Sequence, residues 1–320
     1  MNILTKIFIA FFLSSTACFG SSVEYQWHAL DREWSFSLNL SNDLYDVYSQ
    51  RTRFRDYDLF VTDSFDDKLI GQLTKYFSES LSSLNFQSID VLKFVAAFVQ
   101  SLDYTNDLAT KGIDEYPKFP FETLYDAAGD CEDTSILLAA LQLDLKFEVI
   151  LLEFDQHLAV AVALPQNSVD GYYVESEGKK YFYIETTGNN WDIGQLPDHY
   201  IGSESTILNL TQRPSFQLSS EYSYSYTNMS IELKSEISLF NLGSITSSST
   251  EVKIQVIDFD DYIISESISS PFVVEEEELY KFVSKPLKFI YTSPLKVIVT
   301  VYYMNEPIDQ LIGDWFYLKD

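Results

Sequence analysis

The stretch AAGDCEDTSILLAAL, residues 127–141, contains Cys131, and the only other cysteine of the chain is Cys18. Its apolar residues surround most of a helical axis, which predicts a buried helix over Cys131–Leu143. Asp130 comes just before, so the thiol lies in the first turn, where free backbone N–H groups and the helix dipole lower its pKa. Nearby carboxylates oppose this, since negative charge disfavours a thiolate. Cys131 is therefore either a buried, inert hydrophobe or a nucleophile that needs a histidine.

Of the histidines His28, His157 and His199, the second is placed best. His157 opens the strand-like segment HLAVAVAL, in which it shares one face with the alternating alanines of 159–163. A face of alanines lets a helix approach closely, and we expect the helix that bears Cys131 to pack there. The imidazole would then lie beside the thiol and accept its proton. The alternative is a turn residue at the tip of a hairpin.

An imidazole that acts as a base needs an acceptor on its other nitrogen. The strand-like segment YFYIETT, residues 181–187, carries Glu185 among apolar and aromatic residues. A carboxylate in such a strand is unusual, so we expect Glu185 to orient the histidine, with Asp192 and Asp198 as weaker candidates. The alternative is a charge on an edge strand that faces water.

One amide and a cluster of acidic residues are further candidates for the site. Gln100 ends a helical segment and is a candidate oxyanion donor, although an amide that caps the core is the alternative. Acidic residues gather around the cysteine, but their spacing does not fit a twelve-residue calcium loop, and helix capping explains them. We therefore expect no metal and no cofactor. The acidic residues are Asp126, Asp130, Glu132 and Asp133.

The N-terminus has the layout of a secretory signal peptide over residues 1–20, with Lys6, a short apolar run and small residues. We expect cleavage after Ala17 or Gly20, and export to the periplasm, the cell exterior or the cell envelope. Cleavage before Cys18 would give a lipid-anchored protein, but Ser15 stands where such signals carry an aliphatic residue, so this is not favoured. No later segment is long and uncharged enough to span a membrane.

The formal net charge of −27 limits the partners of the chain. Such a surface repels phosphate backbones and anionic lipid, so we expect no nucleic-acid partner. A hydrophobic content of 46% with 22% charged residues suits a globular protein.

The period of the apolar residues divides the mature chain in two. Residues 23–213 contain helical segments and then antiparallel strands, which predicts an α+β domain. Residues 215–320 read as about seven short strands with turns between them, which predicts an all-β sandwich of immunoglobulin type.

Three motifs together resemble the transglutaminase-like cysteine hydrolase superfamily, especially its bacterial and archaeal proteins: GDCEDTSILLAAL, FDQHLAVAV and YFYIETTG. The resemblance spans roughly Tyr25 to Tyr200. It implies a papain/transglutaminase-like domain, in which a catalytic helix packs on an antiparallel sheet. It also implies Cys131 as nucleophile, His157 as general base and Glu185 as orienting acid. The chain departs from the family in using glutamate where aspartate is usual.

These features lead to one expected function and one alternative. We expect an exported thiol enzyme that acts on amide bonds of protein or peptide substrates, with hydrolysis favoured over cross-linking because water is in excess. The sandwich could bind a cell-surface partner. The alternative is a non-catalytic binding or adhesion protein of the cell envelope that keeps the fold.

Overall fold

The computed structural model describes residues 10–11, 20–51, 53, 57–84, 86–113, 115–165, 168–211, 213–226, 230–243, 245–290 and 294–316. The predicted signal peptide and both predicted cleavage points therefore lie almost wholly outside the described residues. Within those residues, no helix combines the length and the apolar character needed to cross a membrane.

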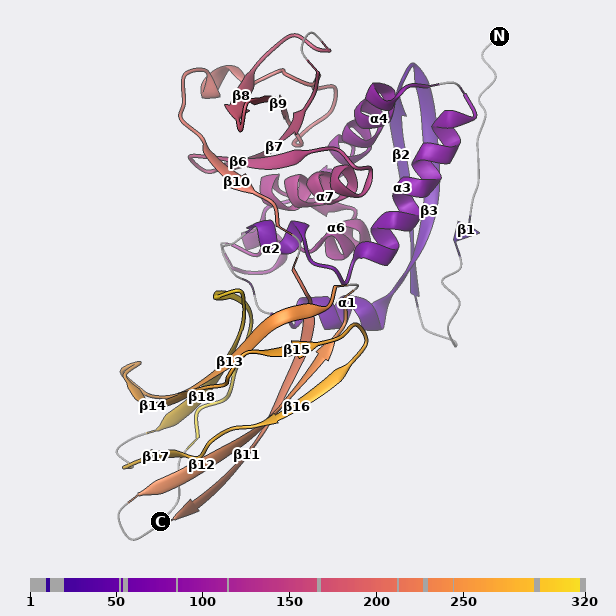
Figure 1. The fold of residues 1–320 in the computed structure, drawn as a ribbon. Helices are drawn as coiled ribbons and strands as arrows, with labels where there is room; N and C mark the ends of the chain where they lie inside the picture. Colours follow the sequence, from indigo (N-terminus) through magenta and orange to yellow (C-terminus); the bar gives the residue numbers. More distant parts are fainter. Residues whose placement is uncertain are drawn as a thin grey trace. The chain divides into compact units, whose positions relative to one another are not determined.

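The chain forms two compact units (Figure 1). The first comprises Met1–Thr62 and Asp66–Thr211, and the second comprises Asp63–Phe65 and Gln212–Asp320. The short segment Asp63–Phe65 thus belongs with residues far along the sequence: Asp63 forms a bridge with Arg213, and a Cβ on Gly243 would collide with the Ser64 side chain. The sequence did not suggest this excursion.

The first unit begins with a hairpin of β2 (Gly20–Ala29) and β3 (Arg32–Ser41), and the short β1 (Ala10–Phe11) pairs parallel with β3. Leu30 and Asp31 have positive φ at the turn, as tight two-residue hairpins require. Alternate residues of both strands are buried, so one face packs on the helices. Trp27 contacts the rings of Phe77 and Phe94 there.

Seven α-helices follow among the described residues of the first unit. They are α1 (Asn42–Ser49), α2 (Tyr57–Val61), α3 (Asp67–Ser82), α4 (Ser88–Gln100), α5 (Asp107–Thr110), α6 (Pro120–Asp126) and α7 (Cys131–Asp144). The helix predicted over Cys131–Leu143 is confirmed as α7, and the helical segment that ends at Gln100 is confirmed as α4. The residues of α7 are buried all round, because it contacts α2, α3, α4 and α6 as well as β6 and β7.

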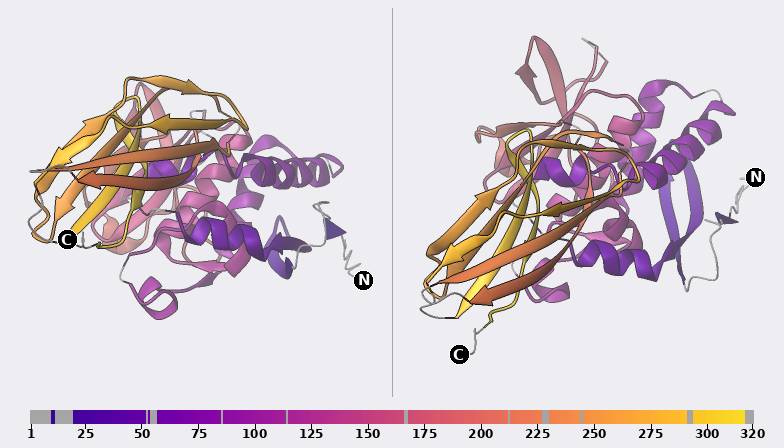
Figure 2. Two further views of the ribbon diagram at one scale, coloured as in Figure 1. Left: turned by 90° about the horizontal axis from the view of Figure 1, so that it is seen from below. Right: turned by 60° about the horizontal axis from the view of Figure 1, so that its bottom comes forward.

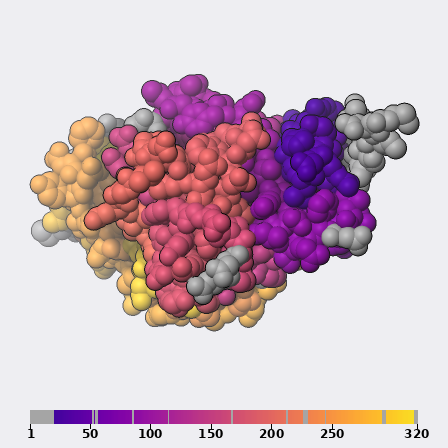
Figure 3. Space-filling model, turned by 90° about the horizontal axis from the view of Figure 1, so that it is seen from above, coloured from indigo at the N-terminus to yellow at the C-terminus, as the bar shows by residue number. Residues whose placement is uncertain are grey.

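An antiparallel sheet completes the first unit, with strand order β10-β6-β7-β9-β8. Its strands are β6 (Val149–Phe154), β7 (His157–Ala163), β8 (Tyr173–Ser176), β9 (Lys179–Ile184) and β10 (Thr206–Asn209). Seen from above, the pink-to-red chain from about residue 150 to 210 covers a broad surface beside the purple N-terminal segments of this unit (Figure 3). A parallel pair of β4 (Asp103–Tyr104) and β5 (Ala128–Gly129) lies apart from this sheet.

The second unit consists of two antiparallel sheets around one core (Figure 2). One sheet holds β11 (Phe216–Tyr226), β12 (Ile231–Asn241), β16 (Leu279–Val283) and β17 (Leu287–Phe289). The other holds β13 (Ser247–Asp258), β14 (Ile263–Ile268), β15 (Phe272–Val274), β18 (Leu295–Tyr303) and β19 (Glu306–Ile312). Alternate residues of β12, β13 and β18 point into the core, as the period-two pattern requires.

The predicted fold class, a papain/transglutaminase-like α+β domain followed by an immunoglobulin-like sandwich, is wrong. Strands make up 43% of the structure and helices 25%, the sheets are antiparallel and sandwich-like, and no papain-like core of a helix on a sheet is present. The prediction gave too much weight to one apolar helix. In the structure α7 is one member of a group of helices that surround it, and long strands at both ends of the chain dominate the composition.

Candidate functional site

Cys131 is the first residue of α7 and is half-buried. Its thiol donates a hydrogen bond to Glu132 Oε2 at 3.0 Å. The backbone N–H of Leu158 donates to the sulfur, which places the thiol beside the start of β7. The thiol therefore lies next to the residue that follows His157.

Hydroxyl groups fix the first turn of α7 against two strands. Ser135 Oγ donates to the Leu158 carbonyl at 2.9 Å. Thr134 Oγ1 and Ser135 Oγ lie 2.8 Å and 3.1 Å from Thr186 Oγ1. Leu158 follows His157, and Thr186 follows Glu185. These three bonds thus bring together the helix start, the beginning of β7 and the end of β9.

His157 and Glu185 form a direct pair. The imidazole Nε2 lies 3.2 Å from Glu185 Oε2, and both side chains are buried. The pairing of β7 with β9 sets Val160 opposite Ile184, and the continued register brings Glu185 diagonally across from His157. The sequence identified both residues of this pair correctly as neighbours.

Tyr183 is a member of the site that sequence reasoning missed. Its hydroxyl lies 3.2 Å from His157 Nε2 and donates to Glu185 Oε2. Because the hydroxyl proton goes to the carboxylate, the phenol oxygen accepts from the imidazole, which assigns a proton to Nε2. The Nδ1 lone pair is then free to accept a proton. In the sequence, the one feature that pointed to Tyr183 was its position on the same strand face as Glu185.

Tyr200 holds the plane of the imidazole. It belongs to the short 3₁₀ helix η1 (Asp198–Tyr200), and its ring stacks on that of His157 at 4.9 Å and 11°. Neither of the other histidines takes the place of His157. His28 pairs with Glu33 on the exposed hairpin, and His199 is exposed and contacts the ring of Tyr200. Asp192 and Asp198 are exposed as well, so Glu185 is the acid that reaches His157.

The carboxylate of Glu185 is held charged. Burial alone would raise its pKa, but hydrogen bonds from His157, Thr187 and Tyr183 outweigh burial and lower the pKa to about 2. Backbone N–H groups of Thr186 and Thr187 also donate to Oε1, at 3.0 Å and 2.9 Å. A fixed negative charge therefore faces the imidazole.

This pKa shift predicts a pH dependence of stability. A folded pKa of about 2 against the ordinary 4.5 stabilises the fold above pH 4.5, and the contribution is lost as the pH falls from 4.5 toward 2. We expect Glu185→Gln to unfold more easily than wild type at pH 7, by about 3 kcal/mol, and the difference to shrink below pH 4.5. Urea denaturation at pH 7, 4 and 3 measures it. The variant Glu175→Gln removes an exposed charge from β8, and a similar loss there would contradict the assignment.

Gln100 does not have the predicted role of an oxyanion donor in this structure. Its amide Nε2 donates to the carbonyls of Glu185 and Trp191, at 2.8 Å and 3.1 Å, and the side chain is buried. Both N–H groups of the amide therefore donate to backbone carbonyls near Glu185. Gln100 supports the position of Glu185 instead.

The thiol is less acidic than the sequence suggested. The helix start predicts a lowered pKa, but burial, followed by the charge and hydrogen bond of Glu132, raises the pKa of Cys131 well above its ordinary value. The N–H of Leu158 opposes this shift only in part. In the resting structure Cys131 is therefore a neutral thiol and not half of an ion pair.

The predicted contact between α7 and the alanine face of β7 is wrong. Ala159 and Ala161 belong to a core cluster with Tyr181 and Tyr183 that contains no residue of α7. The helix approaches the site through its hydroxyl groups at Leu158. Sequence alternation identified the two faces of β7 but not which face each neighbour covers.

The acidic residues around the cysteine separate into two groups. Asp133 and Asp126 face Lys118, whose Nζ lies 2.9 Å and 3.7 Å from their carboxylates. A Cβ at Gly129 would lie 2.5 Å from the Cβ of Asp133, so the approach requires glycine there. Neither Asp130 nor Asp133 caps the helix as predicted. Asp130 precedes α7 but makes no side-chain capping bond, and Asp133 Oδ1 accepts from the backbone N–H of Lys118.

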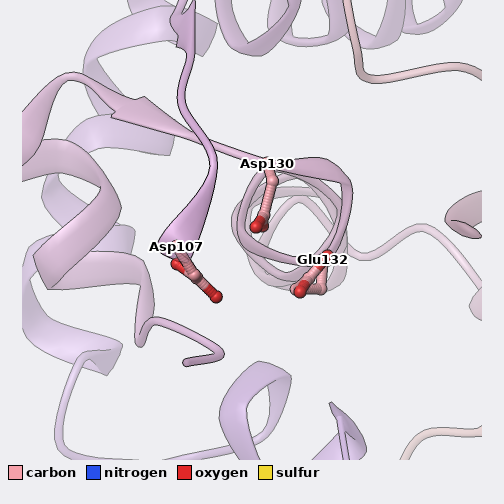
Figure 4. A group of neighbouring side chains, drawn as sticks. All are labelled: Asp107, Asp130 and Glu132. Carbon is pink, nitrogen blue, oxygen red and sulfur yellow. The ribbon is translucent and has the colours of Figure 1, made fainter. Parts of the chain in front are cut away.

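The second group comprises Asp107, Asp130 and Glu132 (Figure 4). One oxygen from each of these carboxylates lies within 4.8 Å of the others. Burial and the charges of Asp133 and Glu132 raise the pKa of Asp130 to about 9. Asp107 could not be recognised from the sequence, because it opens the separate short helix α5, more than twenty residues before Asp130. These are the residues of the described chain that could hold a metal ion.

No protein-family model and no curated protein matches the chain. A beta-glucuronidase from glycoside hydrolase family 2 resembles it in structure, with 8% identity and a TM-score of 0.28, over 52% of this chain and 20% of that one. A family 2 member from Bacteroides cellulosilyticus DSM 14838 is 12% identical with a TM-score of 0.28, over 51% and 24%. A protein from Archaeoglobus fulgidus is 10% identical with a TM-score of 0.22, over 33% and 98%. The match spans about a fifth to a quarter of the two glycoside hydrolases.

The sequence resemblance to the transglutaminase-like superfamily is therefore wrong. The matching structures include glycoside hydrolase family 2 proteins, and no transglutaminase-like protein is found. The description as a transglutaminase-like cysteine protease is wrong for the same reason. Short motifs of common residue types match by chance. The structure nevertheless places Cys131, His157 and Glu185 at the junction of α7, β7 and β9.

Proposed function

We propose that this protein is a thiol enzyme that cleaves amide bonds by acyl transfer, with Cys131 as nucleophile, His157 as general base and Glu185 as orienting acid. One observation carries the proposal: three hydroxyl hydrogen bonds tie the first turn of α7 to the residues that follow His157 and Glu185. A structural thiol does not need a buried imidazole paired with a charged carboxylate at its side.

The arrangement supports a sequence of balanced steps. His157 Nδ1 accepts the proton of Cys131, and the sulfur forms a bond to the amide carbonyl carbon. The imidazolium, stabilised by Glu185, returns the proton to the nitrogen as the C–N bond breaks. His157 then deprotonates a water molecule, whose oxygen bonds to the thioester carbon as the C–S bond breaks, and the imidazolium returns the proton to the sulfur. The N–H groups of the first turn of α7 have no partner within the helix and are suited to the oxyanion.

The substrate class and the location are part of the proposal. The acyl donor is an amide of a protein or peptide, and hydrolysis prevails over transfer to an amine because water is in excess. The apolar leader supports export, and the second unit supplies a surface for a partner at the cell envelope.

An activated ester tests acyl transfer without knowledge of the natural substrate. Incubation with p-nitrophenyl acetate, in Ca²⁺ and in EDTA, should release p-nitrophenol in a burst. Mass spectrometry of the acid-quenched protein should find an acetyl group on Cys131. The variant Cys131→Ala should show neither signal. If wild type carries no adduct on Cys131 in either buffer, the protein is not a thiol acyltransferase, and the non-catalytic binding function takes its place.

A further inference from the structure

Asp107, Asp130 and Glu132 bring three carboxyl groups together where little water reaches. Asp107 is 1% exposed and Asp130 is 7% exposed. The Oδ1 atoms of both aspartates are buried and accept no hydrogen bond from any described residue. A buried carboxylate oxygen without a donor is costly, so two of them at one place point to a missing positive partner.

The backbone holds the two aspartates together. Asp103 and Tyr104 of β4 pair with Ala128 and Gly129 of β5, which sets the segment before Asp107 against the segment before Asp130. Asp107 Oδ2 accepts the backbone N–H of Tyr116 at 2.6 Å, and this bond fixes its carboxylate. Figure 4 shows the three side chains directed toward one another, with Asp107 at the start of α5 and the other two at the start of α7.

The lysines near this group form ion pairs with other acidic residues. Lys118 Nζ pairs with Asp133 and Asp126, and Lys111 Nζ lies 3.6 Å from Asp126. The ion pairs of the described residues include no lysine or arginine bonded to Asp107, Asp130 or Glu132. Within the part of the chain that the structure describes, the group therefore has no cationic side chain as a partner.

We propose that Asp107, Asp130 and Glu132 bind one divalent cation of the calcium type. Carboxylate oxygens are the ligands that hard divalent cations prefer, and water can fill the remaining positions. The three oxygens lie within 4.8 Å of one another, close enough for one ion to contact all of them. Ca²⁺ accepts an irregular set of oxygen ligands, whereas Mg²⁺ requires a near-ideal octahedron, so we assign the larger ion.

The site adjoins the thiol and goes beyond the proposed function. Glu132 Oε2 is the atom that accepts the Cys131 thiol proton, so a bound cation competes with the thiol for this carboxylate. The cation site itself does not need the cysteine. Cation binding can therefore be measured in a protein without the thiol, and failure of one proposal leaves the other standing.

Calorimetric titration of EDTA-treated full-length protein with CaCl₂ tests the site. We expect one Ca²⁺ per chain, weaker binding of Mg²⁺, and a higher melting temperature in Ca²⁺ than in EDTA. Asp130→Asn and Glu132→Gln should each weaken binding at least tenfold. Asp130→Asn should melt below wild type in Ca²⁺, because it loses the stabilisation that the bound cation provides.

Two control variants make the result specific. Asp155→Asn removes an exposed charge from the turn between β6 and β7 and should bind Ca²⁺ as wild type does. Cys131→Ala should also retain binding. The proposal is overturned if 10 mM Ca²⁺ produces neither heat nor a shift in melting temperature, or if Asp130→Asn and Glu132→Gln bind like wild type. Mg²⁺ binding as tight as that of Ca²⁺ would overturn the assignment of the larger ion.

Discussion

His157→Ala should lower the rate of acylation of Cys131 by about 10²–10⁴-fold, the usual contribution of a positioned general base. The effect should be large here because the resting thiol is neutral and donates a hydrogen bond to Glu132, so nucleophilic attack depends on a base that removes its proton. The burst rate of p-nitrophenol measures the loss, and circular dichroism verifies the fold.

The matched control for this change is His28→Ala. His28 is exposed and pairs with Glu33 on the N-terminal hairpin, so its removal should leave the burst unchanged. Equal rates for wild type and His157→Ala would remove the histidine from the mechanism. A loss in both variants would instead trace the effect to general damage.

Lys118→Met should destabilise the first unit by about 3–5 kcal/mol, the cost of leaving one charge of a buried pair unpaired. Lys118 is 1% exposed and Asp133 is fully buried, with Nζ and Oδ2 2.9 Å apart. The lysine Nζ also donates to the carbonyl of Ala128 at 3.1 Å, just before the site. Urea unfolding followed by tryptophan fluorescence reports on this unit, which holds Trp27, Trp34 and Trp191.

A second substitution separates charge from packing. Lys118→Met with Asp133→Asn removes both charges and keeps an acceptor for the Lys118 backbone N–H, so most of the stability should return. Lys179→Met breaks an exposed pair with Glu148 and should produce no measurable change. If the double variant is no more stable than Lys118→Met, the unpaired charge is not the cause.

Sequence periodicity predicted helices and strands whose apolar patterns are visible within one short segment of the chain. The apolar pattern located α4 and α7, and the alternation after residue 148 located β6 and β7, because these patterns depend on neighbours in the chain. His157 and Glu185 were found because each stood out in a strand of apolar residues. Their pairing then followed from the antiparallel register.

The remaining features depend on contacts between distant segments. Asp107 reaches Asp130 only through the pairing of β4 with β5, which are too short to give a pattern of their own. The sign of the pKa shift of Cys131 was wrong because burial outweighs the helix terminus, and burial is a property of the packed unit. The fold class was wrong because short motifs say little about the strands at the two ends of the chain.

The neutral state of Cys131 also bears on its chemical lifetime. Oxidation to sulfenic acid and exchange with small disulfides both proceed through the thiolate. A thiol that donates to Glu132 and is half-buried offers little of that form to peroxide or to oxidised glutathione. The described residues contain no second cysteine that could trap it as a disulfide. In the proposed enzyme, the carboxylate that keeps the thiol neutral would thus also protect it from oxidation between encounters with substrate.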